Sequence, residues 1–165
     1  KMLEGNKDFW RANYNGEFNK NLIGNLSFNL KGRIQLAGGR DELPSSEKFQ
    51  IGGVNTVRGY DEGLLLAEQG ADAMAEIQYN LTSYMPKLIT SSSVYTYFDY
   101  GYISNTQSFI LQNDLSKNIY STGLGLRLSL LKYLDGNVSV ARTLKTNTYL
   151  MDNETKVLFF LQGKF

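Results

Sequence analysis

Apolar and polar residues alternate with a period of two along seven stretches of the chain, and this pattern restricts the possible folds more than any other feature. In residues 26–36, Leu, Phe, Leu, Gly, Ile and Leu alternate with Ser, Asn, Lys, Arg and Gln. Because successive side chains of a β-strand point to opposite faces of its sheet, such a stretch is typical of a strand with one apolar and one polar face. The other six stretches are residues 9–19, 72–81, 92–103, 120–131, 138–144 and 157–165. The sequence therefore predicts an all-β fold with about seven to eight strands in this chain.

The apolar faces of these strands are nearly free of charge, although 20% of all residues are charged. Arg142 is the one charged residue assigned to them. A bulge that turns it inward, or a place near a membrane interface, would accommodate it. Most stretches have about the 9–11 residues that a tilted transmembrane strand needs. A soluble barrel or sandwich with apolar faces inside is the alternative. We predict a transmembrane antiparallel β-barrel whose apolar faces contact membrane lipid.

The connections between the strands alternate between short and long. Residues 20–25, 82–91 and 132–136 are short connections, whereas residues 37–71, 104–119 and 145–156 are long ones. Short turns at one end and long loops at the other are typical of outer-membrane barrels. The first long connection far exceeds a hairpin turn, and loops of such length are usually functional.

Two missing residue types exclude several classes of function. The chain contains no His and no Cys, which excludes Ser-His-Asp hydrolysis, histidine metal sites, disulfides and thiol catalysis. With 17 basic and 16 acidic residues, the net charge of +1 gives no indication of nucleic-acid binding. No apolar run approaches the roughly 20 residues of a transmembrane helix. We expect no catalytic residue, no metal site, no cofactor and no nucleic-acid partner.

Three motifs carry a family resemblance. The first long connection contains Phe49, Gly52, Gly53, Val57, Arg58, Gly59 and Tyr60. This spacing resembles the F-x-x-G-G-x-x-x-V-R-G-Y signature of the BamA/TamA/TpsB superfamily of outer-membrane assembly and secretion barrels, and of its two-partner-secretion transporters above all. A second group, namely Phe98, Asp99 and Gly101, resembles the family motif F-x-D-x-G, and the resemblance implies that this group is the lumenal partner of the loop motif. The final Phe165 is similar to the terminal aromatic residue that delivers such barrels to the outer-membrane assembly machinery.

The resemblance implies an architecture and a contact. Residues 1–165 would form a single transmembrane barrel domain, equivalent to the C-terminal half of the family barrel, with no POTRA domain in this chain. The loop would fold into the lumen, where Arg58 engages Asp99. The residues themselves agree, because an inward carboxylate needs a partner and a guanidinium can bind it through two hydrogen bonds. Glu76 and Arg127 are assigned to the same inward side and are candidates for the same polar network.

The function implied by the resemblance is not enzymatic. We expect a bacterial outer-membrane protein that translocates a client polypeptide or inserts one into the membrane, and that reaches its place through the assembly machinery by its C-terminal strand. The alternative is a passive pore or structural barrel that keeps the motifs only for folding.

The strand count bears on how the barrel closes. An eight-stranded barrel is just wide enough for its own side chains, so it has no room for the first long loop. We therefore expect further strands from a second copy, as a homodimer, or from the remainder of a larger barrel. A small closed monomer with the loop outside is the third possibility.

Overall fold

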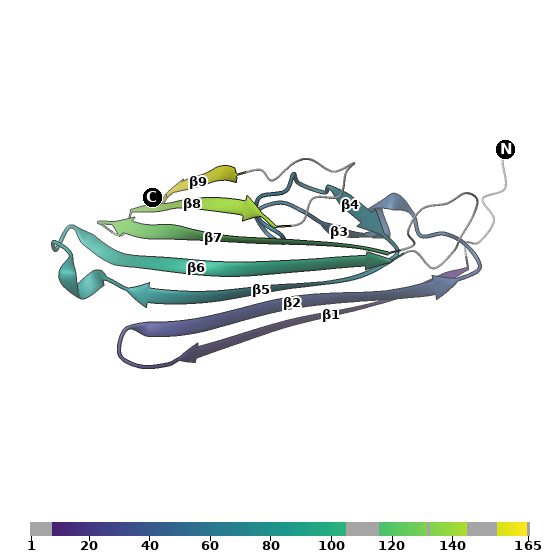
Figure 1. Cartoon of the computed structure of the whole chain (residues 1–165), viewed down its shortest axis with the longest axis horizontal. Coiled ribbons are helices and arrows are strands. Elements are labelled where there is room, and N and C mark those ends of the chain that lie inside the picture. Colours follow the sequence, from purple (N-terminus) through teal and green to yellow (C-terminus); the bar gives the residue numbers. More distant parts are fainter. Residues whose placement is uncertain (1–7, 105–115, 132, 145–154, 165) are drawn as a thin grey trace.

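The computed structural model describes residues 8–104, 116–131, 133–144 and 155–164. In this part of the chain, seven strands form one antiparallel sheet in the order β1-β2-β5-β6-β7-β8-β9 (Figure 1). The strands of this sheet follow one another in chain order, and β2 lies next to β5 because β3 and β4 form a separate sheet. The strands are β1 (Phe9–Asn21), β2 (Leu26–Gly39), β5 (Gln69–Asn80), β6 (Ile89–Ser104), β7 (Ser116–Leu130), β8 (Leu134–Thr143) and β9 (Thr155–Gly163). The seven strands predicted from the alternation are confirmed.

The step from β2 to β5 is a loop that folds back over one face of the sheet. It contains a short 3-10 helix, η1 (Ser45–Glu47), and a two-stranded hairpin made of β3 (Phe49–Ile51) and β4 (Leu65–Ala67). We call the sheet face that this loop covers the inner face, and the opposite face the outer face. The main apolar cluster lies between the loop and the inner face and comprises Phe49, Ile51, Val57, Tyr60, Leu65, Ala67, Ile103 and Ile119.

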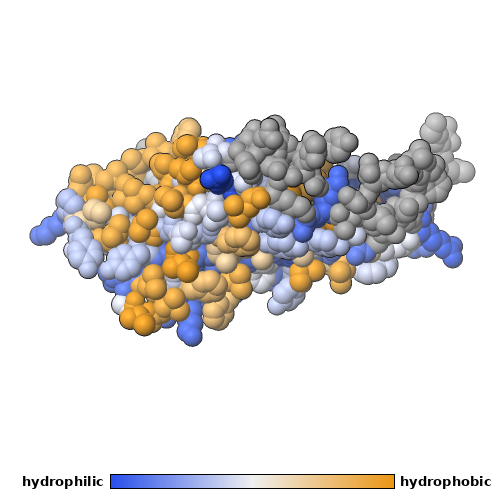
Figure 2. Space-filling view, in the orientation of Figure 1, coloured by the Kyte–Doolittle hydropathy of each residue, from blue (hydrophilic) through white to orange (hydrophobic). Residues whose placement is uncertain are grey.

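The exposed fractions of side chains along β6 follow the alternation of the sequence. Tyr95, Tyr97 and Asp99 are 2%, 3% and 0% exposed and lie on the inner face. Their neighbours Val94 and Phe98 point to the outer face and are 40% and 47% exposed. An exposed apolar face is the lipid-contacting face of a transmembrane barrel. Figure 2 shows apolar side chains gathered on the visible surface, most densely over the half where the short turns lie in Figure 1.

Short and long connections lie at opposite ends of the strands, as the sequence predicts. The turns from β1 to β2, from β5 to β6 and from β7 to β8 lie at one end of the strands, whereas the long loop from β2 to β5 lies at the other (Figure 1). Residues 105–115 and 145–154, which make up most of the other two long connections, lie outside the described residues. The turn from β5 to β6 contains a second 3-10 helix, η2 (Thr82–Tyr84). Among the described residues, no helix is long and apolar enough to cross a membrane.

Arg142 lies on the outer face. Its side chain is exposed, and its neighbours Ala141 and Thr143 are buried. The pairing of β7 with β8 continues without a shift through Thr122↔Arg142, so no bulge turns the arginine inward. It stands one residue before the end of β8, far along the strand from the short turn. The structure thus contradicts the bulge, and a place near a membrane interface, at which a charge costs little, stays a prediction.

Candidate functional site

Three glycines let the loop turn back toward the sheet. Gly52, Gly53 and Gly59 have φ values of 105°, 103° and 94°, which residues with a side chain rarely adopt. A Cβ atom at Gly52 would also lie 2.4 Å from the backbone oxygen of Asp61. Glycine is therefore required here for both conformation and space. The resulting path buries Val57 completely and directs Arg58 into the inner face.

Arg58 binds Asp99 of β6 through three hydrogen bonds. Its Nε donates to Oδ2 at 2.8 Å, its Nη2 to Oδ1 at 2.7 Å and its backbone N–H to Oδ2 at 3.1 Å. Ser121 Oγ of β7 adds a weaker contact to Oδ2 at 3.4 Å. The side chain of Asp99 is 0% exposed and that of Arg58 is 11% exposed. The contact expected from the two motifs is present, as a buried, bidentate ion pair.

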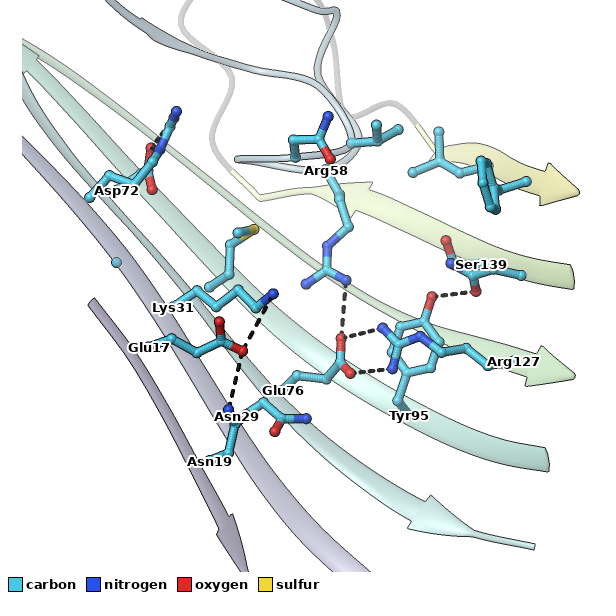
Figure 3. A pocket seen from close by; sticks show the side chains of 18 of the residues that line it. Glu17, Asn19, Asn29, Lys31, Arg58, Asp72, Glu76, Tyr95, Arg127 and Ser139 are labelled. Carbon is cyan, nitrogen blue, oxygen red and sulfur yellow. Dashed lines mark hydrogen bonds and ion pairs between the residues drawn. The ribbon is translucent and has the colours of Figure 1, made fainter. Parts of the chain in front are cut away.

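Arg58 also belongs to a wider network on the inner face. Arg58 Nη1 donates a hydrogen bond to Oε2 of Glu76 on β5 at 3.3 Å. Arg127 of β7 binds both carboxylate oxygens of Glu76, at 2.5 Å and 3.0 Å (Figure 3). Glu76 thus bridges the two arginines, and the prediction that Glu76 and Arg127 join the polar network of Arg58 and Asp99 is confirmed.

The network keeps the loop arginine charged. Burial on its own would lower the pKa of the Arg58 guanidinium, but the hydrogen bond and the charge of Asp99 raise this pKa above its ordinary value.

The structure corrects the assignment of Phe98 to the inward partner motif. Phe98 lies on the outer face and is 47% exposed, whereas Tyr97 is 3% exposed. The reason is the period of two, which puts residues 97, 99 and 101 on one face and residue 98 on the other. Tyr97 takes the inward aromatic position, and its ring centroid lies 3.5 Å from Arg58 Cζ, within cation–π range. Gly101 leaves room for the loop, because a Cβ atom there would lie 2.8 Å from Cγ2 of Val57.

Beyond Arg58, the loop continues across the remaining strands. A Cβ atom on Gly59 would meet Ala141 of β8 at 3.3 Å, so the backbone passes close to that strand. Tyr60 Oη donates to the carbonyl of Tyr120 on β7 at 3.1 Å. Asp61 forms an ion pair with Lys156 of β9 at 2.5 Å. Residues 58–61 therefore contact all four strands from β6 to β9.

The inner face holds a second ion pair that the sequence analysis did not predict. Arg33 of β2 donates through Nε to Asp72 of β5 at 2.9 Å, and its Nη2 donates to the backbone carbonyl of Gln50 at 3.2 Å. Its guanidinium also lies 5.1 Å from the ring centroid of Phe49. Arg33 and Asp72 are direct cross-strand partners. Pairing the two polar faces in register would have revealed them, because opposite charges on neighbouring strands attract.

A polar cavity of about 1080 Å³ lies between the loop and the inner face. Figure 3 shows Glu17, Lys31 and Glu76 directed into it, from β1, β2 and β5. Among the described residues, no group of three or more acidic, His or Cys side chains could hold a metal ion. Phe165 lies outside the described residues, and its role as an assembly signal stays a prediction.

Known proteins resemble this chain in both sequence and fold. The chain is 31% identical over 149 residues to the heme/hemopexin transporter protein HuxB of Haemophilus influenzae strain 86-028NP, which covers 90% of this chain and 26% of that protein. Two solved structures share the fold, and each match covers 94% of this chain and 27% of the chain in the solved structure. They are CdiB from Escherichia coli, with a TM-score of 0.80 at 16% identity, and CdiB from Acinetobacter baumannii, with a TM-score of 0.69 at 21% identity.

The chain thus spans about a quarter of the length of these relatives. Residues 1–130 match the family model described as the Omp85 superfamily domain. The match includes the loop, Arg58 and Asp99, and most of the strands of the sheet. The chain belongs to the Omp85 superfamily of β-barrel proteins of the bacterial outer membrane.

Proposed function

We propose that this chain forms part of the wall of an outer-membrane barrel that translocates polypeptides or inserts them into the membrane. The observation that carries the proposal is the loop anchor, in which Arg58 is held by Asp99 and Glu76. Membership of the Omp85 superfamily and the likeness to a protein named as a transporter support it. The proposed partner is a client polypeptide, and the proposed role of the loop is to brace the wall from the lumen.

No chemistry is part of this proposal. The protein would transport or insert its client through the shape of the polar cavity and through strand edges that can pair with a client strand. The arginines and carboxylates around Arg58 bind one another, which suits a structural brace. We propose a non-enzymatic role without a cofactor.

We further infer that other strands complete the wall. In the described residues, β1 pairs with β2 alone and β9 with β8 alone, so each leaves one edge without a partner strand. Unpaired backbone groups cannot face hydrocarbon, which requires closure by more strands. A second copy of this chain or additional strands of a longer polypeptide would supply them.

Export of a co-expressed client polypeptide tests the function. Cells that carry the protein should release the client, and Arg58→Ala should lower release strongly. Arg40→Ala is the matched control, because Arg40 lies in the same loop with a side chain that is 91% exposed. Ion conductance in planar bilayers without any client export would contradict the proposal and favour a passive pore.

A further inference from the structure

A second arginine lies beside the loop anchor, on a tyrosine ring that crosses the sheet. Tyr95 of β6 is 2% exposed, and Arg127 Cζ lies 3.9 Å from its ring centroid. Tyr95 Oη donates to Oδ1 of Asn137 on β8 at 2.8 Å. The side chain therefore reaches from β6 across β7 to β8 and presents a flat surface beneath the guanidinium (Figure 3).

A glycine makes room for this ring. Gly125 of β7 is the direct cross-strand partner of Tyr95. A Cβ atom at Gly125 would lie 2.4 Å from Cζ and 2.5 Å from Oη of Tyr95. Its three nearest atoms all belong to Tyr95, so an added methyl group would displace the ring and leave the backbone in place.

The arginine on this surface fixes the carboxylate that Arg58 uses. Arg127 binds both oxygens of Glu76, and its Nη1 also donates to Gln78 Oε1 at 3.0 Å. The Glu76 side chain is only 10% exposed, so it needs these partners more than a solvated carboxylate would. Arg58 reaches Glu76 at 3.3 Å, a longer contact than those Arg127 makes.

We propose that Arg127, held flat by Tyr95 over Gly125, is a positioning residue for the loop anchor: it fixes Glu76 so that Glu76 can bind Arg58. Two guanidinium groups carry only donors and cannot hydrogen-bond to each other, so Arg127 acts on Arg58 through their shared acceptor Glu76. The inference rests on the proposed bracing role of the loop. Its test measures how firmly the loop is anchored and is independent of transport.

Thiol labelling in the membrane-embedded protein gives this measurement. The chain has no Cys, so Val57→Cys introduces a single thiol at a loop position that is 0% exposed. In this background, Arg127→Ala should raise the labelling rate at least about fivefold, the lower end of typical coupling between sites. Lys31→Ala is the control, because Lys31 also lies on the inner face but pairs with Glu17, at 3.6 Å. It should leave the rate unchanged.

A second comparison tests the pathway through Glu76. If Arg127 acts through this carboxylate, Glu76→Gln should raise labelling to a similar degree, and combining it with Arg127→Ala should add little. Arg127→Lys should restore only part of the protection, because an ammonium cannot bind both carboxylate oxygens in a fixed plane. Equal labelling of Arg127→Ala and Lys31→Ala, or fully additive effects of the first two changes, would overturn the proposal.

The glycine provides an independent test with an internal rescue. Gly125→Ala should reduce the folded fraction in membranes severalfold, whereas Gly136→Ala should not, because a Cβ atom at Gly136 meets nothing closer than 3.7 Å. Adding Tyr95→Ser to Gly125→Ala removes the ring and should restore folding. Labelling at position 57 should nevertheless stay high in this double variant, since Arg127 has lost its support. Normal folding of Gly125→Ala, failed rescue, or full protection in the double variant would each contradict the inference.

Discussion

At the scale of single residues, the anchor is a set of buried charges that depend on one another. Asp99 is 0% exposed and receives Nε and Nη2 of Arg58. A buried pair is not in itself a strong source of stability, but removing one partner leaves the other uncompensated. The loop's attachment should therefore respond sharply to changes at these two positions.

Arg58→Ala should destabilise the protein by about 3–5 kcal/mol, the range for breaking a buried ion pair. The physical reason is that Asp99, whose side chain is 0% exposed, would lose the hydrogen bonds and the opposite charge that compensate its burial. Urea unfolding of the detergent-folded protein measures the effect. Arg40→Ala, in the exposed part of the same loop, should change stability by well under about 1 kcal/mol. Equal effects of the two changes would contradict the burial of the anchor.

The loop's contact with β9 should be much weaker than its contact with β6. Asp61 and Lys156 form an ion pair at 2.5 Å, with side chains that are 56% and 27% exposed. Exposed pairs contribute roughly 0–1 kcal/mol. Asp61→Asn should therefore leave the urea midpoint almost unchanged. A loss as large as that of Arg58→Ala would show that the loop is anchored mainly at β9.

At the scale of elements, each strand has one lipid face and one inner face. Leu126 of β7 points outward and is 39% exposed, whereas Ser129 of the same strand points inward. Leu126→Arg should cost roughly 2–4 kcal/mol if it lies near the membrane midplane, and Ser129→Arg should be mild. The folded fraction after refolding into lipid vesicles measures both. If Leu126→Arg folded normally and Ser129→Arg did not, the assignment of the lipid face and the inner face would be wrong.

The strands were predictable because alternation is a local property of the sequence. All seven are present, yet β6 and β7 begin several residues earlier than the alternation indicates, at Ile89 and Ser116. Polar residues dominate both of these starts, including Thr90–Ser93, so the two faces cannot be told apart there. The three-residue strands β3 and β4 are too short for any alternation to identify them.

The site was predictable only as far as its motifs reach. The sequence indicated Arg58 and Asp99 through a family resemblance, because the two residues come from different elements and no local pattern joins them. The motif resemblance groups Phe98 with the inward residues, whereas the alternation correctly places it outward. The support of Arg127 by Tyr95 depends on a ring that crosses a neighbouring strand at Gly125, a fact of three-dimensional packing.

At the scale of the whole molecule, the two free edges of the described sheet require further strands to close the barrel. Tyr14 of β1 and Phe159 of β9 are outer-face residues of the two edge strands, 70% and 83% exposed. With Tyr14→Cys and Phe159→Cys combined, a short bis-maleimide should form no link within one chain in the membrane. A link between chains would identify a second copy as the source, and no link would favour additional strands of one polypeptide. A link within a monomer-sized particle would contradict the account.

The central claim is that the loop is held against the inner wall by Arg58, and labelling at two valines of that loop tests it most directly. Val57 is 0% exposed, whereas Val54 is 53% exposed and lines the cavity. In the membrane-embedded protein, Val57→Cys should react far more slowly with a soluble maleimide than Val54→Cys, because labelling requires the loop to open. Adding Arg58→Ala should bring the two rates together. Equal rates with Arg58 intact would contradict the account.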